Sequence, residues 1–169
     1  AGPEIPQGIV CHEPVSLVDA FPTILAATGV APDPADRGLP GRNLFDVARG
    51  IATPRTVMTE YHAGGAPTGA FMIRKGRLKF VYYVGMPAQL FDLDADPQET
   101  RDLAAEPGYR GLAADCEKEL RAVVDPEAAD RLAKSDQAAR IAAFGGREAI
   151  LGRGSFAYSP APGTAAIYN

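Results

Sequence analysis

Hydrophobic side chains recur at helical spacing in the first part of the chain. Those that would share one face of a helix are Leu17, Phe21, Ile24 and Leu25. Intervals of three to four residues bring side chains to the same side of a helix, so the pattern predicts a helix over Ser16–Ala27. The apolar pair within Pro6–His12 predicts a short strand before it.

Residues that favour helix boundaries flank this predicted helix. Ser16 is a suitable N-cap, and Asp19 stands three residues later in the capping-box position. Pro22 does not suit the middle of a helix, so it marks either the start of the main helix or a kink in it. Gly29 can end the helix, because glycine readily adopts the left-handed conformation that follows a last turn.

In the middle of the chain the pattern changes to β-branched and aromatic residues that alternate with polar ones. Four segments have this pattern: Thr56–Tyr61, Ala70–Arg74, Leu78–Val84 and Gln89–Leu93. Such segments are typical of short strands, and the Lys75-Gly76 pair favours a tight turn between the second and the third. We therefore expect an α+β fold, with a small antiparallel sheet of three to four strands packed with helices.

Helical spacing returns in the last third of the chain. An amphipathic helix is predicted over Tyr109–Val124, with an apolar face formed by Leu112, Cys116, Leu120 and Val123. Pro126 ends it, and Glu127–Phe144 predicts one or two further helices before an extended tail from Gly152. These changes predict a strand, helix and loop in residues 1–53, a sheet with its packed helix in 54–125, and a helical extension with a tail in 126–169.

Composition and charge exclude several classes of partner. The chain has 169 residues, of which 46% are hydrophobic and 22% are charged, which is the balance of an ordinary globular protein. The net charge is −4 with both signs interspersed, so there is no basic stripe to indicate binding to nucleic acid. No apolar run approaches the roughly 20 residues that span a bilayer. The chain begins at Ala1 rather than at a methionine, which indicates a processed or truncated start and leaves the cellular compartment open.

Neither the cysteines nor the acidic run indicates a metal site. Cys11 and Cys116 lie far apart without a C-x-x-C partner, so both are expected to be ordinary thiols. The run DLDAD at 92–96 resembles the start of an EF-hand loop. However, Pro97 and Leu103 occupy the positions that require glycine and glutamate. We expect no metal ligand and no cofactor in this chain.

His62 is the side chain whose sequence surroundings point to chemistry. It follows the predicted strand Thr56–Tyr61 and opens a glycine-rich loop, and such strand ends often present polar groups to ligands. An imidazole there could bind or protonate an oxyanion. Glu60 would point to the same side of the strand, where its carboxylate could orient the imidazole. The alternatives are a solvated loop histidine and a charged residue at a sheet edge.

Four cationic side chains cluster around the predicted turn: Arg74, Lys75, Arg77 and Lys79. They could bind an anion, although a solvated hairpin tip is the favoured explanation. The sequence patterns of a nucleophile elbow, a P-loop and a dinucleotide-binding loop are absent from the chain. The residues alone therefore predict no catalytic side chain.

Two segments, in the same order, resemble the C-terminal part of sulfatases of the alkaline phosphatase superfamily. Pro14–Val30 is similar to the helix V-S-x-x-D-x-x-P-T-x-x-x-x-x-G of that family. Met72–Leu103 is similar to its R-x-G-x-x-K hairpin followed by the closing turn L-F/Y-D-L-x-x-D-P-x-E. The matched residues are Val15, Ser16, Asp19, Pro22, Thr23, Gly29, Arg74, Gly76, Lys79, Leu90, Phe91, Asp92, Leu93, Asp96, Pro97, Glu99, Asp102 and Leu103.

Within this family, the combination Glu60-Tyr61-His62 followed by AFMIRKGRLKF resembles arylsulfatase K-type members. The resemblance implies a sulfate-ester substrate, and for this subgroup a sulfated sugar of the uronate 2-sulfate class. It also implies that His62 and Glu60 bind substrate. The fold that it implies is the C-terminal subdomain of an alkaline-phosphatase-like α/β sulfatase.

The resemblance further implies the chemistry of the intact enzyme. A Cys or Ser in a C/S-x-P-x-R motif becomes formylglycine, whose hydrate attacks sulfur while a divalent cation, usually Ca2+, holds the sulfate. Neither that motif nor the D-H-G metal segment of the family occurs here, and Cys11 is followed by His-Glu-Pro-Val. We therefore expect the C-terminal portion of a sulfuric ester hydrolase, inactive alone. The alternatives are part of a phosphonate or phosphodiester hydrolase of the same superfamily, and a non-catalytic interaction domain.

The resemblance also carries an expectation about association. In the family, the strand at Pro6–His12 would join the edge of a larger sheet and the helix Ser16–Ala27 would pack on it. Alone, these segments would expose an unpaired edge and apolar surface. The isolated chain is therefore expected to self-associate.

Overall fold

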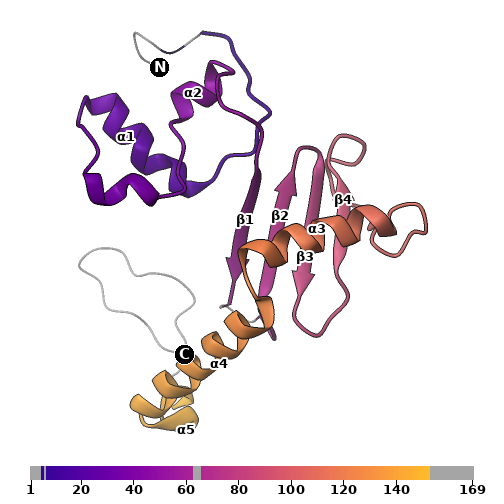
Figure 1. The fold of residues 1–169 in the computed structure, drawn as a ribbon. Coiled ribbons are helices and arrows are strands. Elements are labelled where there is room, and N and C mark those ends of the chain that lie inside the picture. Colours follow the sequence, from indigo (N-terminus) through magenta and orange to yellow (C-terminus); the bar gives the residue numbers. More distant parts are fainter. Residues whose placement is uncertain (1–4, 6, 63–65, 153–169) are drawn as a thin grey trace. The chain divides into compact units, whose positions relative to one another are not determined.

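A computed structural model describes residue 5, residues 7–62 and residues 66–152 of the chain (Figure 1). The chain divides into two compact units, Ala1–Val124 and Asp125–Asn169. The extended tail predicted from Gly152 lies almost entirely outside the described residues.

A four-stranded antiparallel sheet with the order β1-β2-β3-β4 is the centre of the first unit (Figure 1). Its strands are β1 (Thr56–Tyr61), β2 (Ala70–Lys75), β3 (Leu78–Tyr83) and β4 (Gln89–Asp92). Each strand pairs with the next one along the chain, so every connection can be short. The α+β prediction and its antiparallel sheet are confirmed.

The turn between β2 and β3 lies one residue later than the predicted Lys75-Gly76 pair. Lys75 pairs with Leu78, which leaves Gly76 and Arg77 as a two-residue turn. Gly76 has a φ of +53°, the left-handed conformation that such hairpin turns require. The predicted glycine therefore provides the conformation that closes the hairpin.

One face of the sheet is covered by helix α3 (Arg110–Val123), which contacts β2 and β3. The cross-strand neighbours Ile73, Phe80 and Leu90 are buried there. Cys116 and Leu120 are the residues of α3 that are buried, at 3% and 0% exposure. The predicted apolar face was therefore too wide, because Leu112 and Val123 at the helix ends remain 36% and 66% exposed.

The N-terminal part of this unit holds two short 3-10 helices and two α-helices. They are η1 (Leu17–Asp19), α1 (Ala20–Thr28), η2 (Pro34–Gly38) and α2 (Leu44–Ala48). The single helix predicted over Ser16–Ala27 is thus divided into η1 and α1. Pro22 lies in the first turn of α1, where its missing N–H costs no helical hydrogen bond. Gly29 ends α1 with a φ of +69°, as predicted.

The strand predicted over Pro6–His12 is wrong for the part that is described. Residues 7 and 8 form a turn, with Gly8 at a φ of +70°, and residues 9–12 belong to no helix or strand. A strand needs a neighbour to bond its backbone, and the apolar pair Ile9-Val10 finds none among the described residues.

The described residues of the second unit form two helices. Helix α4 (Pro126–Ala143) begins with Pro126 directly after its N-cap Asp125, whose side chain accepts a hydrogen bond from the backbone N–H of Ala128. Gly145 then leads into α5 (Gly146–Leu151). In the described part of the chain, no helix is both long and apolar enough to cross a membrane.

Candidate functional site

His62 lies immediately beyond the end of β1, the strand that carries Glu60. The structure brings the two side chains together: the imidazole Nε2 is 3.7 Å from Glu60 Oε2. The His62 side chain is 22% exposed and that of Glu60 is 49% exposed, so both can meet a ligand from solvent. The two predicted site residues therefore form one pair at the end of the strand.

The imidazole of His62 also packs on an aromatic ring. Its centroid is 5.2 Å from that of Phe71 with an interplanar angle of 78°, which is an edge-to-face arrangement. Phe71 is fully buried, and it is the cross-strand neighbour of Glu60. The ring thus rests on the core while one edge of the imidazole remains near solvent and carboxylate.

Gly69 closes the same site from the other side of the loop. A Cβ atom at this position would lie 3.0 Å from His62 Cε1 and 3.1 Å from a ring carbon of Phe71. In the sequence, Gly69 is one of several glycines in the loop after His62, and Phe71 is an ordinary apolar residue of a predicted strand. No local signal in the sequence shows that these two residues meet at the imidazole. Residues 63–65 of this loop, including Gly64 and Gly65, lie outside the described part of the chain.

The chemistry available to this pair follows from its two groups. A neutral imidazole can donate and accept a hydrogen bond, and a protonated one can bind an anion. The carboxylate of Glu60 can form an ion pair with the imidazole when the ring is protonated. The arrangement can therefore hold a polar or anionic group of a ligand at the end of β1.

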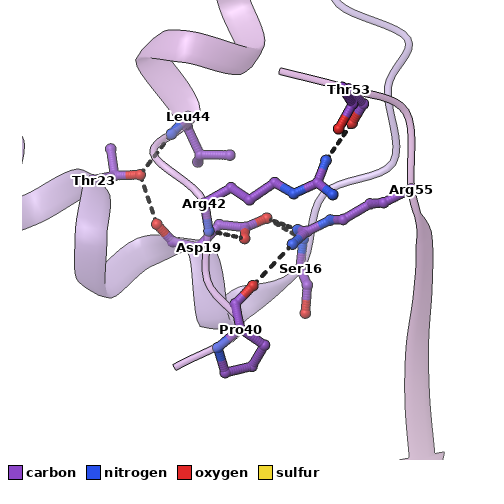
Figure 2. Close-up of polar contacts among 8 residues, drawn as sticks. All are labelled: Ser16, Asp19, Thr23, Pro40, Arg42, Leu44, Thr53 and Arg55. Atoms are coloured by element: carbon purple, nitrogen blue, oxygen red, sulfur yellow. Dashed lines mark hydrogen bonds and ion pairs between the residues drawn. The ribbon is translucent and has the colours of Figure 1, made fainter. Parts of the chain in front are cut away.

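The first sulfatase-like segment, in contrast, serves structure. Figure 2 shows the fully buried carboxylate of Asp19 at its centre. Asp19 Oδ2 accepts a hydrogen bond from the backbone N–H of Ser16 at 2.8 Å and pairs with the guanidinium of Arg55. Asp19 Oδ1 accepts a hydrogen bond from the backbone N–H of Arg42, also at 2.8 Å. The acid thus joins η1, the loop before α2, and the residue before β1.

Thr23 forms a second set of hydrogen bonds, which connects α1 to the start of α2 (Figure 2). Its hydroxyl donates to the backbone carbonyl of Asp19 at 2.6 Å and accepts from the backbone N–H of Leu44 at 2.9 Å. The Ser16, Asp19 and Thr23 positions of the motif therefore take part in one hydrogen-bond network around the buried carboxylate.

In the second segment, aspartate carboxylates likewise accept hydrogen bonds from backbone N–H groups, most of them within the same segment. Asp102 Oδ1 accepts from the N–H groups of Leu90 and Ala104 at 3.0 and 2.9 Å. Asp96 Oδ2 accepts from the N–H of Arg101 at 2.8 Å. Asp92 is buried, accepts from the N–H of Asp94 at 3.2 Å, and pairs with a cation from the hairpin. The acidic run therefore shapes a turn after β4.

The cations at the hairpin are mostly engaged by acids. Three of the four form ion pairs: Lys75 with Glu119, Arg77 with Asp92, and Lys79 with Glu99. Arg74 donates from Nε to the backbone carbonyl of Gly76 at 3.2 Å. The arrangement argues against the anion-binding hypothesis for this cluster, because an added anion would compete with three carboxylates.

Glu119 joins the hairpin to helix α3. It accepts hydrogen bonds from the ammonium of Lys75 and, at 2.8 Å, from the hydroxyl of Thr56. These two hydrogen bonds lower the pKa of Glu119. Glu119 thus has a structural role, because its two hydrogen bonds connect α3 to β1 and β2.

The thiols and the carboxylates present no ready metal site in the described residues. No group of three or more His, Cys, Asp or Glu side chains in that part of the chain could hold an ion. Cys11 is exposed and Cys116 is buried, and both are free. Burial raises the pKa of the Cys116 thiol, which disfavours the thiolate that a metal would bind. These residues do not fit a calcium site or a formylglycine site.

Comparison with known proteins gives consistent matches over most of the chain. It is 33% identical to arylsulfatase K of Danio rerio over 133 residues, which are 73% of the chain and 24% of that protein. It is 35% identical to choline-sulfatase of Rhizobium meliloti (strain 1021) over 107 residues, 63% of the chain and 21% of that protein. The chain thus spans about a quarter of the length of the curated relatives it matches. No protein-family model matches it.

Solved structures show the same similarity in the fold. A crystal structure of a putative sulfatase from Bacteroides thetaiotaomicron superposes with a TM-score of 0.62 at 28% identity, covering 72% of the chain and 27% of that protein. The structure of a 2-O GAG sulfatase superposes with a TM-score of 0.61 at 27% identity, covering 81% of the chain and 30% of that protein.

Proposed function

The chain is a homologue of the C-terminal portion of sulfatases, and on this basis we propose that it forms that portion of a sulfuric ester hydrolase. One observation carries the proposal. Both sulfatase-like segments are present in the family's order, and in each of them aspartate carboxylates accept hydrogen bonds from backbone N–H groups. These are Asp19 in the first segment, and Asp96 and Asp102 in the second. Two separate segments in the family's order, together with the sequence and fold similarity to sulfatases, favour common descent over chance similarity.

Within such an enzyme, we assign the pair His62 and Glu60 to substrate binding. Its support is the position of the pair beyond a strand end, with 3.7 Å between Nε2 and Oε2 and with both side chains reached by solvent. The imidazole would donate a hydrogen bond to an oxygen of the substrate, and the Glu60 carboxylate would hold the ring in orientation. This role selects substrate and leaves bond cleavage to other groups.

For the substrate class we propose a sulfated sugar, with uronate 2-sulfates as the first candidates. Support comes from arylsulfatase K among the sequence relatives and from a 2-O GAG sulfatase among the structural ones. A hydroxyl-rich sugar offers many hydrogen-bonding atoms, which suits an imidazole and carboxylate pair at an open strand end.

Formylglycine and Ca2+ are the groups that sulfatases use for the reaction, and the described residues of this chain do not fit either of them. We propose that other parts of a longer protein supply both. The chain alone is then expected to be inactive towards sulfate esters.

The test is an assay of the longer protein for sulfate release from an aryl sulfate and from a 2-O-sulfated uronate disaccharide. We expect the longer protein to release sulfate and this chain alone to release none above background. A gene that encodes no catalytic portion before Ala1 would overturn the proposal in favour of an interaction domain. Turnover of phosphonate or phosphodiester substrates without any sulfate release would overturn it in favour of phosphorus chemistry.

We also propose that the isolated chain self-associates through its N-terminal part. Helix α1 has no buried residue although most of its side chains are apolar. Leu17 is 93% exposed and Ile24 is 59% exposed. Apolar side chains gathered on one segment favour contact with a second apolar surface in water.

A further inference from the structure

We propose that Gly69 is a positioning residue for His62, because its missing side chain leaves the space in which the imidazole lies against Phe71. The inference rests on the proposed role of His62 in substrate binding, since a fixed imidazole matters only if it meets a ligand. The geometry of the inference can nevertheless be tested without any substrate.

The close contacts identify the role of the glycine. A Cβ at position 69 would lie 3.0 Å from His62 Cε1, 3.1 Å from His62 Nδ1 and 3.1 Å from Phe71 Cε2. These distances are shorter than ordinary van der Waals contacts between carbon atoms. A side chain at position 69 therefore requires at least one of the three residues to move.

The backbone conformation does not explain the glycine. The φ of Gly69 lies outside the left-handed region that glycine alone adopts easily, unlike that of Gly76 at +53°. The φ of this residue therefore does not by itself require glycine. The obstacle to alanine is steric, because the imidazole of His62 and the ring of Phe71 occupy the space that its Cβ would need.

Position 69 is itself tied down on both sides. The carbonyl of Gly69 accepts a hydrogen bond from the backbone N–H of Val84 at 3.2 Å. The hydroxyl of Thr68 donates to the carbonyl of Val84 at 2.9 Å, and Ala70 is already paired with Tyr61 in the sheet. The backbone at position 69 is therefore restrained by hydrogen bonds to the residue that follows β3.

Of the two rings near Gly69, the imidazole is the one that can give way. Phe71 is fully buried, so moving its ring would disturb the core of the sheet. His62 follows the last residue of β1, and its side chain is 22% exposed. A methyl group at position 69 would require the imidazole to shift by a few tenths of an ångström against the Phe71 ring and would change its approach to Glu60.

The test uses the fact that the chain has two histidines, His12 and His62. In the full chain, His12→Asn leaves one imidazole, whose Cε1–Hε1 signal is followed by nuclear magnetic resonance. We expect Gly69→Ala to shift this signal, because the imidazole changes its position over the edge-to-face contact with the Phe71 ring. Gly111→Ala is the matched control, since a Cβ there meets nothing within 4 Å, and it should leave the signal in place.

An unchanged His62 signal in a folded Gly69→Ala chain overturns the proposal. If Gly69→Ala does not fold, the double variant Gly69→Ala with His62→Ala decides, because the second change removes the imidazole, which makes two of the three close contacts, and leaves room for the methyl group to shift away from Phe71. Folding restored by the double variant supports the proposal, and a double variant that remains unfolded overturns it.

The same substitution in the longer protein separates this inference from the proposed function. If His62 binds substrate, Gly69→Ala should raise KM and lower kcat/KM at least about fivefold, because displaced binding groups lose productive geometry. A shifted imidazole signal with unchanged kinetics would keep Gly69 as the positioning residue and reject the substrate role of His62.

Discussion

The carboxylate of Asp19 and the guanidinium of Arg55 form an ion pair across 36 positions of sequence, at a point where the acid is fully buried. The pair connects η1 to the residue that precedes β1. This ion pair therefore connects the N-terminal helices to the sheet through a carboxylate that is shielded from water. Removing Asp19 or Arg55 would leave the remaining charged group without its partner.

Replacing Asp19 by alanine should lower the free energy of unfolding by about 3 kcal/mol, because the change leaves a partly buried guanidinium and two backbone N–H donors without their acceptor. Urea denaturation followed by circular dichroism measures the effect. Asp46→Ala is the control, since its pair with Arg49 is an exposed i,i+3 contact at 3.8 Å and should change stability by less than about 1 kcal/mol. Equal effects of the two substitutions would contradict the role assigned to Asp19.

The stability contributed by this pair should depend on pH in the acid range. Burial by itself would raise the pKa of Asp19, but hydrogen bonds from the N–H groups of Ser16 and Arg42, together with Arg55, lower it below 3.8. A carboxyl whose pKa is lower in the folded state stabilises the fold above its unfolded pKa. That contribution is lost as the pH falls through the folded pKa.

We therefore expect the difference in unfolding free energy between wild type and Asp19→Asn to be constant above about pH 5 and to narrow below pH 3.8. Urea titrations at a series of pH values measure both proteins under the same conditions. A difference that does not change across the acid range would contradict the assignment.

Gly41 should tolerate no side chain, because a Cβ there would lie 2.2 Å from the backbone carbonyl oxygen of Val18. Backbone cannot rotate away as a side chain does, so Gly41→Ala should cost about 1–3 kcal/mol of stability. Gly38→Ala, whose Cβ meets nothing within 4 Å, is the matched control and should be near neutral. Thermal denaturation of the two variants compares them, and the same midpoint in both would count against the close approach.

His62→Ala in the longer protein should lower kcat/KM for a sulfated sugar at least about tenfold, because one hydrogen-bonding or charged contact to substrate is lost. His12→Ala, which changes the other histidine at an exposed position, is the control and should leave the kinetics unchanged. Steady-state assays with both variants measure the effect. An unchanged kcat/KM in a folded His62→Ala enzyme would reject the substrate role.

The isolated chain should elute as a species larger than a monomer in size-exclusion chromatography with light scattering. Leu17→Lys combined with Ile24→Lys should shift it towards monomer, because both changes place charge on the exposed apolar segment. Leu132→Lys, at another exposed leucine, serves as the control and should not change the mass. A wild-type chain that is monomeric at all concentrations would refute self-association.

Much of the local structure could be predicted because its causes are local. The alternation within Thr56–Tyr61 predicts its strand, Gly76 predicts the hairpin, and Gly29 predicts the end of α1. Where the cause is distant, the prediction fails. Pro6–His12 has the composition of a strand, but a strand requires a neighbour, and the described residues offer it none.

The candidate site divides in the same way. The sequence placed Glu60 and His62 on one side of a strand end, because alternation along a strand is a property of the strand itself. Both sulfatase-like segments could also be recognised from the sequence, because a motif is defined by the order and spacing of its residues. The sequence did not indicate that Asp19 meets Arg55, or that Gly69 and Phe71 enclose His62.

The sequence by itself thus determined the order and type of most elements, the likeness to sulfatases and the two candidate side chains. Only the tertiary structure decided which acids are structural and what surrounds the imidazole. The physical reason is that burial and ion pairing depend on contacts between residues far apart in the chain, such as Arg55 with Asp19 across 36 positions, and no local pattern encodes them.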